Sequence, residues 1–253
     1  MRTLVAIPVY NEQGYVQGVL ERVREFAQQI LVIDDGSTDA TGDLLTRLQG
    51  PLDFELIRHP TNHGYGRSLL DAFAFAHGRG FDWLITMDCD EQHEPAAIPR
   101  FLEAAEQNDL DLISGSRYLT LEEDSDSPPA DRRAINHRIT AEINERLGLT
   151  LTDGFCGFKA HRVSSLAEIS MNETGYAFPM QLWVRAVAAG LRIGEIPVRL
   201  IYNDASRSFG GGLDVPEVRL EHYRQVLHCE LERCADRLPA QALDGVSAGC
   251  RCQ

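Results

Sequence analysis

The sequence predicts an α/β fold in which a mainly parallel central sheet is covered by helices on both faces. Short runs rich in β-branched residues alternate with longer stretches whose apolar residues recur every three or four positions. That alternation is typical of βαβ units. The chain has 253 residues, of which 43% are hydrophobic, so it can build one large domain. We expect this domain over residues 1–238, followed by a disordered, Gly- and Ser-containing tail over residues 239–253.

The first half of the chain alternates regularly between the two kinds of element. Strands are expected where the runs are apolar, at residues 3–9, 30–33, 54–58, 84–87 and 110–114. Helices are expected between them, at residues 14–26, 41–48, 65–77 and 98–107. Right-handed crossovers bring the carboxyl ends of parallel strands to one rim of the sheet, where such folds bind their ligands.

The second half is less regular. Residues 120–131 are acidic, contain Pro128 and Pro129 and lack an apolar period, which predicts an exposed loop that could serve as a lid. From Arg132 onward apolar residues recur every four positions as far as Leu147, which predicts an amphipathic helix with a basic start. A helix at 175–189, a strand at 193–201 and, after a Gly-rich hinge, a terminal helix at 215–237 complete the expected order.

Composition and charge argue against several classes of protein. The chain has 24 Lys and Arg against 38 Asp and Glu, and the net charge of −14 repels nucleic acid. No signal peptide is visible, and no stretch of ~20 apolar residues could span a bilayer. We therefore expect a cytoplasmic protein whose cysteines are thiols. The late cysteines lack a convincing zinc-site spacing: Cys229, Cys234, Cys250 and Cys252.

An acidic pair follows the apolar run that ends at residue 87. In an extended backbone Asp88, Asp90 and Gln92 would point to one side, because alternate residues share a face. Carboxylate oxygens at that spacing suit Mg2+ or Mn2+, which keep open positions for water and substrate phosphates. A solvated acidic turn is the alternative interpretation of the pair alone.

Two other segments end expected strands at the same rim. Residues 7–12 place polar groups where a base or ribose could be met. In residues 33–39, Asp39 suits a helix N-cap, whereas the adjacent Asp34 and Asp35 need a compensating partner. A hydrogen-bonded nucleobase or ribose is one such partner.

With these three segments in this order, the chain resembles the family 2 glycosyltransferases of GT-A fold, and among them the dolichyl- or polyprenyl-phosphate sugar synthases. The resemblance covers roughly residues 3 to 209. Its motifs are residues 8–12, 34–39, 62–64, 87–93 with Pro95, 115–117, Asp153 with 157–159, 175–178 and 195–198.

The resemblance implies a role for each matching residue. It implies a GDP- or UDP-sugar donor bound by Pro8, Tyr10, Glu12, Asp35 and Asp88. It implies a divalent ion held by Asp88 and Asp90 with Gln92 near, and a catalytic group of Asp90, Arg117 and Gln181. Candidates to hold an acceptor phosphate are Arg117, Arg132, Arg133 and Arg207, with Arg138 on the same basic helix.

The acceptor can be argued from acid–base chemistry. A sugar hydroxyl needs a positioned general base, whereas a phosphate monoester is already an oxyanion at neutral pH. Polyprenyl-phosphate synthases often carry Glu three residues after the Phe of the Gly-Tyr-x-Phe segment, and here Gln181 stands there. Since Gln cannot act as a base, a polyprenyl phosphate at a membrane surface is the favoured acceptor.

Three alternatives stay open. A soluble hydroxyl acceptor would need a base such as Asp153. Gln181 and the divergent 203–209 segment would also suit a protein that binds a nucleotide sugar without catalysis. A nucleotidyltransferase shares the fold class and the metal-binding acids, but it normally has a Gly-rich phosphate loop after the first strand, and residues 8–12 offer none.

Overall fold

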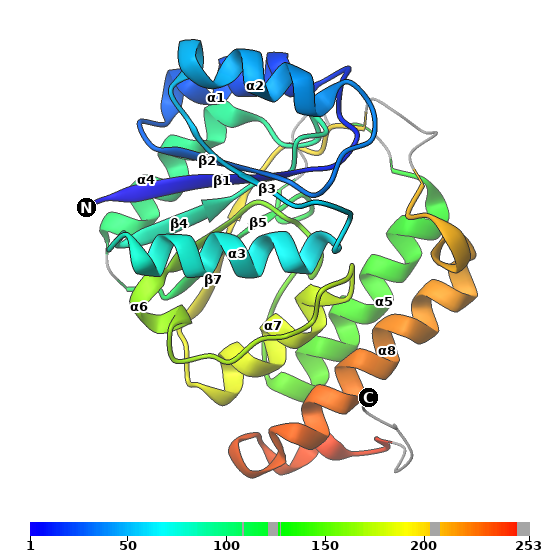
Figure 1. The fold of residues 1–253 in the computed structure, drawn as a ribbon. Coiled ribbons are helices and arrows are strands. Elements are labelled where there is room, and N and C mark those ends of the chain that lie inside the picture. The colour runs from blue at the N-terminus through cyan, green and yellow to red at the C-terminus, as the bar shows by residue number, and fades with distance from the viewer. Residues whose placement is uncertain (108, 121–125, 127, 203–207, 247–253) are drawn as a thin grey trace.

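A seven-stranded mixed sheet forms the centre of the molecule (Figure 1). The computed structural model describes residues 1–107, 109–120, 126, 128–202 and 208–246. The strands lie in the order β3-β2-β1-β4-β6-β5-β7. Their bounds are β1 Thr3–Val9, β2 Ile30–Asp34, β3 Glu55–Arg58, β4 Trp83–Thr86, β5 Leu112–Ser116, β6 Lys159–Arg162 and β7 Ile193–Pro197.

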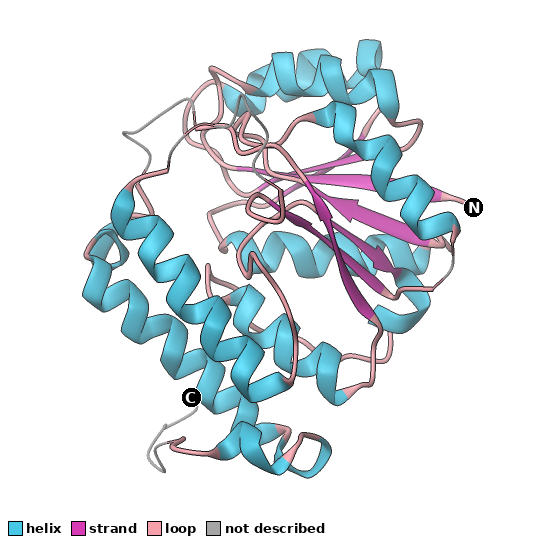
Figure 2. Cartoon of the chain, turned by 180° about the vertical axis from the view of Figure 1, so that it is seen from behind, coloured by secondary structure: helices cyan, strands magenta, loops and turns pink. Residues whose placement is uncertain are grey.

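Helices cover both faces of this sheet (Figure 2). The α-helices are α1 Val16–Phe26, α2 Thr41–Leu52, α3 Tyr65–Gly78, α4 Ile98–Glu106, α5 Ala130–Leu147, α6 Val163–Leu166, α7 Phe178–Ala188 and α8 Pro216–Arg233. Short 3-10 helices are η1 Pro95–Ala97, η2 Gly211–Asp214, η3 Ala235–Arg237 and η4 Ala240–Leu243. The expected α/β fold is therefore confirmed.

Alternation along the strands divides the core between the two faces. In β1, Val5 and Ile7 pack in the cluster that includes the buried side chains of α1 and α4, whereas Leu4 and Ala6 pack in the cluster that includes Ala72 of α3. Successive strand residues point to opposite faces, so a strand buried on both sides must be apolar throughout. These continuous apolar runs explain why the parallel strands could be predicted from the sequence.

A second apolar cluster holds the later helices together. Buried side chains of α5, α7 and α8 form one cluster with Leu112 of β5. Figure 2 shows α5 and α8 side by side, and both run alongside α7 rather than over the centre of the sheet. No helix of the described residues is long and apolar enough to cross a membrane.

Strand β6 was not predicted. It pairs antiparallel with both β4 and β5, in an otherwise parallel sheet. Its residues include the buried Lys159 and His161, so it lacks the apolar run that marks the other strands. The register pairs Thr86 with Lys159, and continuing it brings Gly157 opposite Asp88 at the rim.

The chain also stays folded beyond the expected domain boundary at residue 238. Ala242 in η4 is fully buried, and Arg146 Nη1 donates hydrogen bonds to the carbonyl oxygens of Ala242 (3.1 Å) and Asp244 (2.8 Å). Residues 239–246 therefore depart from the expected disordered tail because α5 supplies their packing and hydrogen bonds. Residues 247–253, with Cys250 and Cys252, lie outside the described residues. Within the described residues the four cysteines are free thiols: Cys89, Cys156, Cys229 and Cys234.

Candidate active site

The loops after β1 and β2 are hydrogen-bonded to each other. Asn11 Oδ1 accepts the backbone N–H groups of Thr38 (2.8 Å) and Asp39 (3.3 Å). Gln13 Oε1 accepts the N–H of Ala40 at 3.0 Å. Asn11 has φ 56°, a left-handed conformation that Asn tolerates better than most residues. Sequence reasoning gave Asn11, which lies inside the predicted donor segment, no role of its own, and it missed Gln13, which lies just after that segment.

The proposed nucleoside contacts of the first loop lie at the end of β1. Tyr10 is 42% exposed, while Pro8 and Glu12 are half-buried. The Glu12 carbonyl accepts the N–H of Val16 at 2.9 Å, which fixes the loop to the start of α1. The structure thus brings Pro8, Tyr10 and Glu12 to the carboxyl rim, as predicted.

The adjacent acids of the second loop find their partners within the protein. Asp34 Oδ1 accepts the N–H of Ser37 (3.0 Å), and Asp34 Oδ2 accepts from Arg58 Nε (3.2 Å). Asp39 Oδ1 accepts the N–H of Thr41, the first residue of α2, at 2.9 Å. The N-cap residue of α2 is Ala40, so the expectation that Asp39 occupies that position is wrong; Asp39 lies one residue earlier and still accepts the first N–H of the helix. The partners of Asp34 come from Ser37 and Arg58.

Asp35 is buried behind the turn that precedes α3. Its Oδ1 accepts the N–H of His63 (2.9 Å) and its Oδ2 that of Gly64 (2.8 Å). His59 Nδ1 lies 2.6 Å from Asp35 Oδ1, and His59 Nε2 lies 2.8 Å from Asp71 Oδ2. These groups of the protein compensate the buried charge of Asp35, a role for which the sequence had suggested a nucleobase or ribose. Asp35 shapes this turn, and it is only 3% exposed.

Asp88 is held on three sides at the end of β4. The hydroxyl of Tyr65 donates to Asp88 Oδ1 at 3.0 Å, and the N–H of Asp88 donates to His93 Nδ1 at 3.0 Å. A Cβ atom on Gly157 would lie 2.4 Å from Asp88 Oδ2, so this carboxylate rests directly on a glycine. The Asp88 side chain keeps 31% of its surface exposed. Its place at the rim suits a ligand-binding carboxylate.

Tyr65 and His93, which contact Asp88, are uncharged near neutral pH. Burial, followed by the negative charge of Asp88, raises the pKa of Tyr65 well above its usual value. Burial is also the main reason that the pKa of His93 falls to about 4. Because His93 Nδ1 accepts a hydrogen bond, its proton is on Nε2, 3.8 Å from Cys156 Sγ. Burial raises the pKa of Cys156 to about 11.

The backbone after Asp88 turns instead of staying extended. Glu91 has φ 59°, and its side chain pairs with Arg22 of α1 at 2.5 Å. Asp90 Oδ1 accepts the N–H of Gln92 at 3.1 Å. The prediction that Asp88, Asp90 and Gln92 share one face of an extended strand is therefore wrong, because β4 ends at Thr86.

The acidic pair still fits a divalent ion that relies on substrate and water for part of its coordination. Within the described residues no group of three or more His, Cys, Asp or Glu side chains could hold a metal. Mg2+ and Mn2+ sites at diphosphates commonly use only one or two protein carboxylates. Asp88 and Asp90 provide hard oxygen atoms of that kind, whereas the geometry gives no separate support for Gln92.

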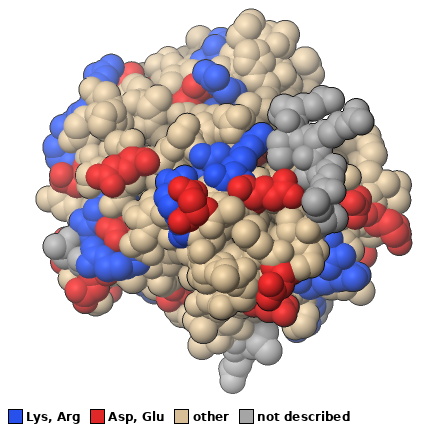
Figure 3. Space-filling view, turned by 90° about the horizontal axis from the view of Figure 1, so that it is seen from below, with Lys and Arg blue, Asp and Glu red and all other residues tan. Residues whose placement is uncertain are grey.

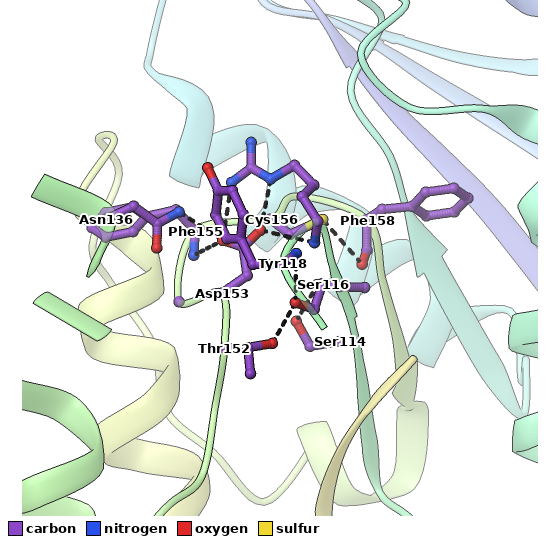
Figure 4. Close-up of polar contacts among 12 residues, drawn as sticks. Ser114, Ser116, Tyr118, Asn136, Thr152, Asp153, Phe155, Cys156 and Phe158 are labelled. Carbon is purple, nitrogen blue, oxygen red and sulfur yellow. Dashed lines mark hydrogen bonds and ion pairs between the residues drawn. The ribbon is translucent and has the colours of Figure 1, made fainter. Parts of the chain in front are cut away.

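Arg117 and Asp153 form a buried ion pair after β5 (Figure 4). Arg117 donates from Nε to Asp153 Oδ2 (2.6 Å) and from Nη2 to Asp153 Oδ1 (3.0 Å). Asn136 of α5 donates to the same carboxylate at 2.8 Å. Burial alone would raise the pKa of Asp153, but the charge and hydrogen bonds of Arg117 outweigh it and hold this pKa far below its usual value.

This ion pair limits what either residue can do. A carboxylate with a strongly lowered pKa is a poor proton acceptor, so Asp153 is not suited to be the general base of a hydroxyl-acceptor reaction. Arg117 already binds a carboxylate with two of its donors. A contact between Arg117 and an acceptor phosphate therefore stays a prediction.

The basic start of α5 is surrounded by aromatic rings. Arg132 Cζ lies 4.9 Å from the ring centroid of Phe209, and Arg219 Cζ lies 4.6 Å from the same ring. Arg117 and Arg133 both lie 5.8 Å from the ring of Tyr118, which brings these two predicted cations together. Arg138 is exposed farther along α5, and Arg207 lies outside the described residues.

Gln181 is not at an open catalytic position. It is 1% exposed in α7, and its Oε1 accepts the N–H groups of Asn172 (2.7 Å) and Glu173 (2.8 Å). Its Nε2 donates to Asn172 Oδ1 (2.8 Å) and to Glu230 Oε1 of α8 (2.9 Å). These contacts are structural: they hold the 172–175 segment and join α7 to α8.

Comparison with known sequences gives consistent matches. The family model described as glycosyl transferase family 2 matches residues 4–170. The chain is 32% identical over 220 residues to an undecaprenyl-phosphate mannosyltransferase of Micrococcus luteus, covering 84% of this chain and 89% of that protein. It is 32% identical over 226 residues to a polyprenol monophosphomannose synthase of Mycolicibacterium smegmatis, covering 85% and 83% of the two chains.

Solved structures share the fold at lower identity. A glucosyl-3-phosphoglycerate synthase from Mycobacterium tuberculosis, in complex with Mn2+, UDP and glucosyl-3-phosphoglycerate, matches with a TM-score of 0.64 and 17% identity over 94% of this chain and 81% of that one. S. aureus TarS residues 1–349, in complex with UDP-GlcNAc, matches with a TM-score of 0.53 and 17% identity over 92% and 72%.

Proposed function

The chain belongs to the family 2 glycosyltransferases, and we propose that it transfers a sugar from a nucleotide sugar to a polyprenyl phosphate. Two relatives at 32% identity are named undecaprenyl-phosphate mannosyltransferase and polyprenol monophosphomannose synthase. The observation that carries the choice of acceptor is the buried Arg117–Asp153 pair. It makes Asp153, the base named for a hydroxyl acceptor, a poor proton acceptor, and a phosphate acceptor needs no base.

The donor half of the site would be the rim of β1 and β4. Pro8, Tyr10 and Glu12 would contact the nucleoside, and Asp88 and Asp90 would hold a divalent ion at the diphosphate. When bound, such an ion supplies charge neutralisation to the departing diphosphate. Asp35 would act on the nucleoside indirectly, by fixing the turn before α3 through its hydrogen bonds to His63 and Gly64.

The acceptor half would be the basic and aromatic start of α5. Arg132 and Arg133 would bind the acceptor phosphate, since a planar guanidinium matches phosphate oxygens and a helix N-terminus favours an anion. An acceptor oxygen would form its bond to the anomeric carbon as the bond to the nucleoside diphosphate breaks. This in-line displacement inverts the anomeric centre and transfers no proton.

The protein would meet its lipid acceptor at a membrane surface. On the face shown in Figure 3, acidic and basic side chains are interspersed, without one extended basic field. At a net charge of −14, anionic lipid repels the molecule as a whole. The local cations at the start of α5 are the better candidates for bringing the lipid phosphate to the site.

Sugar transfer to an extracted lipid tests the proposal directly. Purified protein with Mn2+, a radiolabelled GDP- or UDP-hexose and undecaprenyl phosphate in detergent should move the label into the organic phase. Arg132→Ala should raise the KM for undecaprenyl phosphate, while Arg138→Ala, an exposed arginine on the same helix, should change it little. Transfer to water-soluble acceptors alone, with none to the lipid, would contradict the proposal.

A further inference from the structure

We propose that Tyr65 is a positioning residue for Asp88, and that its hydroxyl sets the affinity of the acidic pair for a divalent ion. The proposal rests on the proposed function, because it gives Asp88 its role at the donor diphosphate. None of the motifs that carry the family resemblance includes Tyr65. Its position follows from four features of the fold.

The hydroxyl of Tyr65 orients one Asp88 oxygen. It donates to Oδ1 at 3.0 Å, while the backbone N–H of Asp88 is held by His93. A carboxylate with both its main chain and one oxygen fixed has lost most of its rotational freedom before a ligand arrives. Outer hydrogen-bond partners of this kind commonly tune metal affinity because they orient the ligating side chain.

The absence of a side chain at Gly157 makes room for the hydrogen-bonded side chains of Tyr65 and Asp88. A Cβ atom at residue 157 would lie 2.4 Å from Asp88 Oδ2 and 2.8 Å from the Tyr65 hydroxyl. Real Cβ atoms do not approach oxygen so closely, so any side chain here would displace the carboxylate, the phenol or both. The glycine backbone is therefore the surface against which Tyr65 and Asp88 are aligned.

The backbone of Tyr65 is itself rigidly held. A Cβ atom on Gly64 would lie 2.4 Å from the carbonyl oxygen of Thr174, and one on Gly66 would lie 2.3 Å from that of Glu173. The N–H of Arg67 donates to the Thr174 carbonyl at 3.2 Å. Two glycines thus let the start of α3 pack backbone to backbone on the 173–175 segment, with Tyr65 between them.

The ring of Tyr65 has a separate support. It stacks on Tyr176, with centroids 6.1 Å apart and planes inclined by 15°. Tyr176 in turn meets Phe209 edge-on at 5.5 Å, beside the cations of α5. The ring stack and the hydroxyl bond are therefore separable, and Tyr65→Phe should remove only the second.

Mn2+ binding by calorimetry, with Mn2+ alone and with GDP or UDP present, is the experiment. Tyr65→Phe should weaken Mn2+ binding about 10-fold or more, with little change in nucleotide affinity in the absence of metal. The enzymatic counterpart is a raised KM for Mn2+ with kcat recovered at saturating Mn2+. Tyr223→Phe removes the hydroxyl of another buried tyrosine, in α8, and should bind Mn2+ like the wild type.

Gly157→Ala provides an independent variant, because it should displace Asp88 and Tyr65 without altering either residue. It should also weaken Mn2+ binding. Unchanged Mn2+ affinity in folded Tyr65→Phe and Gly157→Ala, with affinity lost in Asp90→Ala, would overturn the role of Tyr65 and leave the proposed function standing. A wild-type protein that transfers sugar without binding Mn2+ would overturn both the metal role and this proposal.

Discussion

Gln181 illustrates how a single residue can look catalytic in a sequence and be structural in the fold. The resemblance leads one to expect Glu at this position, and Gln suggests a lost base. In the structure the amide nitrogen donates to Glu230 Oε1, which Arg233 also binds, while Arg185 binds Glu230 Oε2. A carboxylate at 181 would face that of Glu230 without a proton between them. The presence of Gln instead of Glu at position 181 is therefore explained by its hydrogen bond to Glu230 of α8 and does not indicate a lost active site.

Replacing Gln181 by Glu should destabilise the protein by about 1–3 kcal/mol, because it exchanges a buried hydrogen bond for a like-charge contact. The deficit should shrink as pH falls, since the carboxyl pair would share a proton. Urea unfolding at two pH values measures this. The double variant Gln181→Glu/Glu230→Gln restores a donor opposite an acceptor and should recover much of the loss. Additive effects of the two changes would contradict this account.

The Arg117–Asp153 pair makes a second prediction at the scale of single residues. Asp153 is fully buried, so Arg117→Met should cost about 3–5 kcal/mol by leaving its charge unpaired. In the wild type, a lowered pKa means that Asp153 adds stability above its ordinary pKa of 3.8, and that this stability is lost as pH falls through the folded value.

In Arg117→Met the sign reverses, because burial then dominates and raises the pKa of Asp153. The variant's deficit should therefore be smaller at pH 5 than at pH 7.5 in chemical unfolding. Arg117→Met/Asp153→Leu serves as the control, since it removes both charges and should show no such pH dependence. An equal deficit at both pH values in the single variant would contradict the interpretation.

The sequence could not predict these pairings. Arg117 and Asp153 are 36 residues apart, and Gln181 and Glu230 are 49 apart. Motif matching identified Arg117 and Asp153 separately. It gave Arg117 the task of binding a phosphate and Asp153 that of a general base. Only the folded chain shows that the two side chains bind each other.

At the scale of elements, the parallel strands and their helices were predictable and β6 was not. Strand β1 has the predicted bounds, and α3 differs from its prediction by one residue at its end, because apolar periodicity marks both. Strand β6 has the sequence Lys-Ala-His-Arg, and neighbouring strands determine its conformation. Tertiary context overrides local propensity in such a short polar segment.

The contact between the first two rim loops gives an element-scale prediction. Asn11→Ala removes the acceptor for two N–H groups and places a Cβ residue with no compensating polar group at φ 56°. We expect a loss of about 1–2 kcal/mol and weaker nucleotide binding. Thermal unfolding and calorimetry with GDP or UDP measure the two effects.

Two substitutions separate backbone strain from hydrogen bonding in this loop. Asn11→Gly tolerates the positive φ but lacks the acceptor, whereas Asn11→Asp keeps an acceptor oxygen. Asn11→Asp should retain most of the nucleotide affinity, and Asn11→Gly should not. If Asn11→Gly binds nucleotide like the wild type, the loop contact does not organise the donor site.

At the scale of the whole molecule, a buried histidine in the centre of the sheet makes the fold sensitive to acid. His161 is 1% exposed, and within the described residues its Nδ1 has no hydrogen-bond partner. Burial, and then the charge of Lys159, lowers its pKa from 6.5 to about 3. The unfolded chain therefore binds a proton that the folded protein excludes, and stability is lost as pH falls from 6.5 towards 3.

The loss attributable to His161 amounts to as much as about 1.4 kcal/mol per pH unit in that window. His161→Phe should flatten the pH dependence of stability because it removes the titrating group. A phenyl ring suits this site, since the ring centroids of Phe73 and His161 lie 5.1 Å apart. Chemical unfolding between pH 7 and pH 4.5 measures it. His137→Gln changes an exposed histidine of α5 and should leave the slope as in the wild type. Equal slopes for His161→Phe and the wild type would contradict the assignment.

The order of the strands in the sheet bears on how the substrate specificity of this enzyme can evolve. Strands β3, β2, β1 and β4 come from one continuous stretch of the gene and carry the proposed donor site, while β6, β5 and β7 with α5 carry the proposed acceptor site. If the proposed function holds, the two substrates contact different stretches of the chain, and the proposed donor and acceptor sites adjoin where β4 pairs with β6. On that proposal, substitutions in one stretch would alter the choice of lipid or of sugar separately, whereas Gly157 would have to stay a glycine because a Cβ atom there would lie 2.4 Å from Asp88 Oδ2.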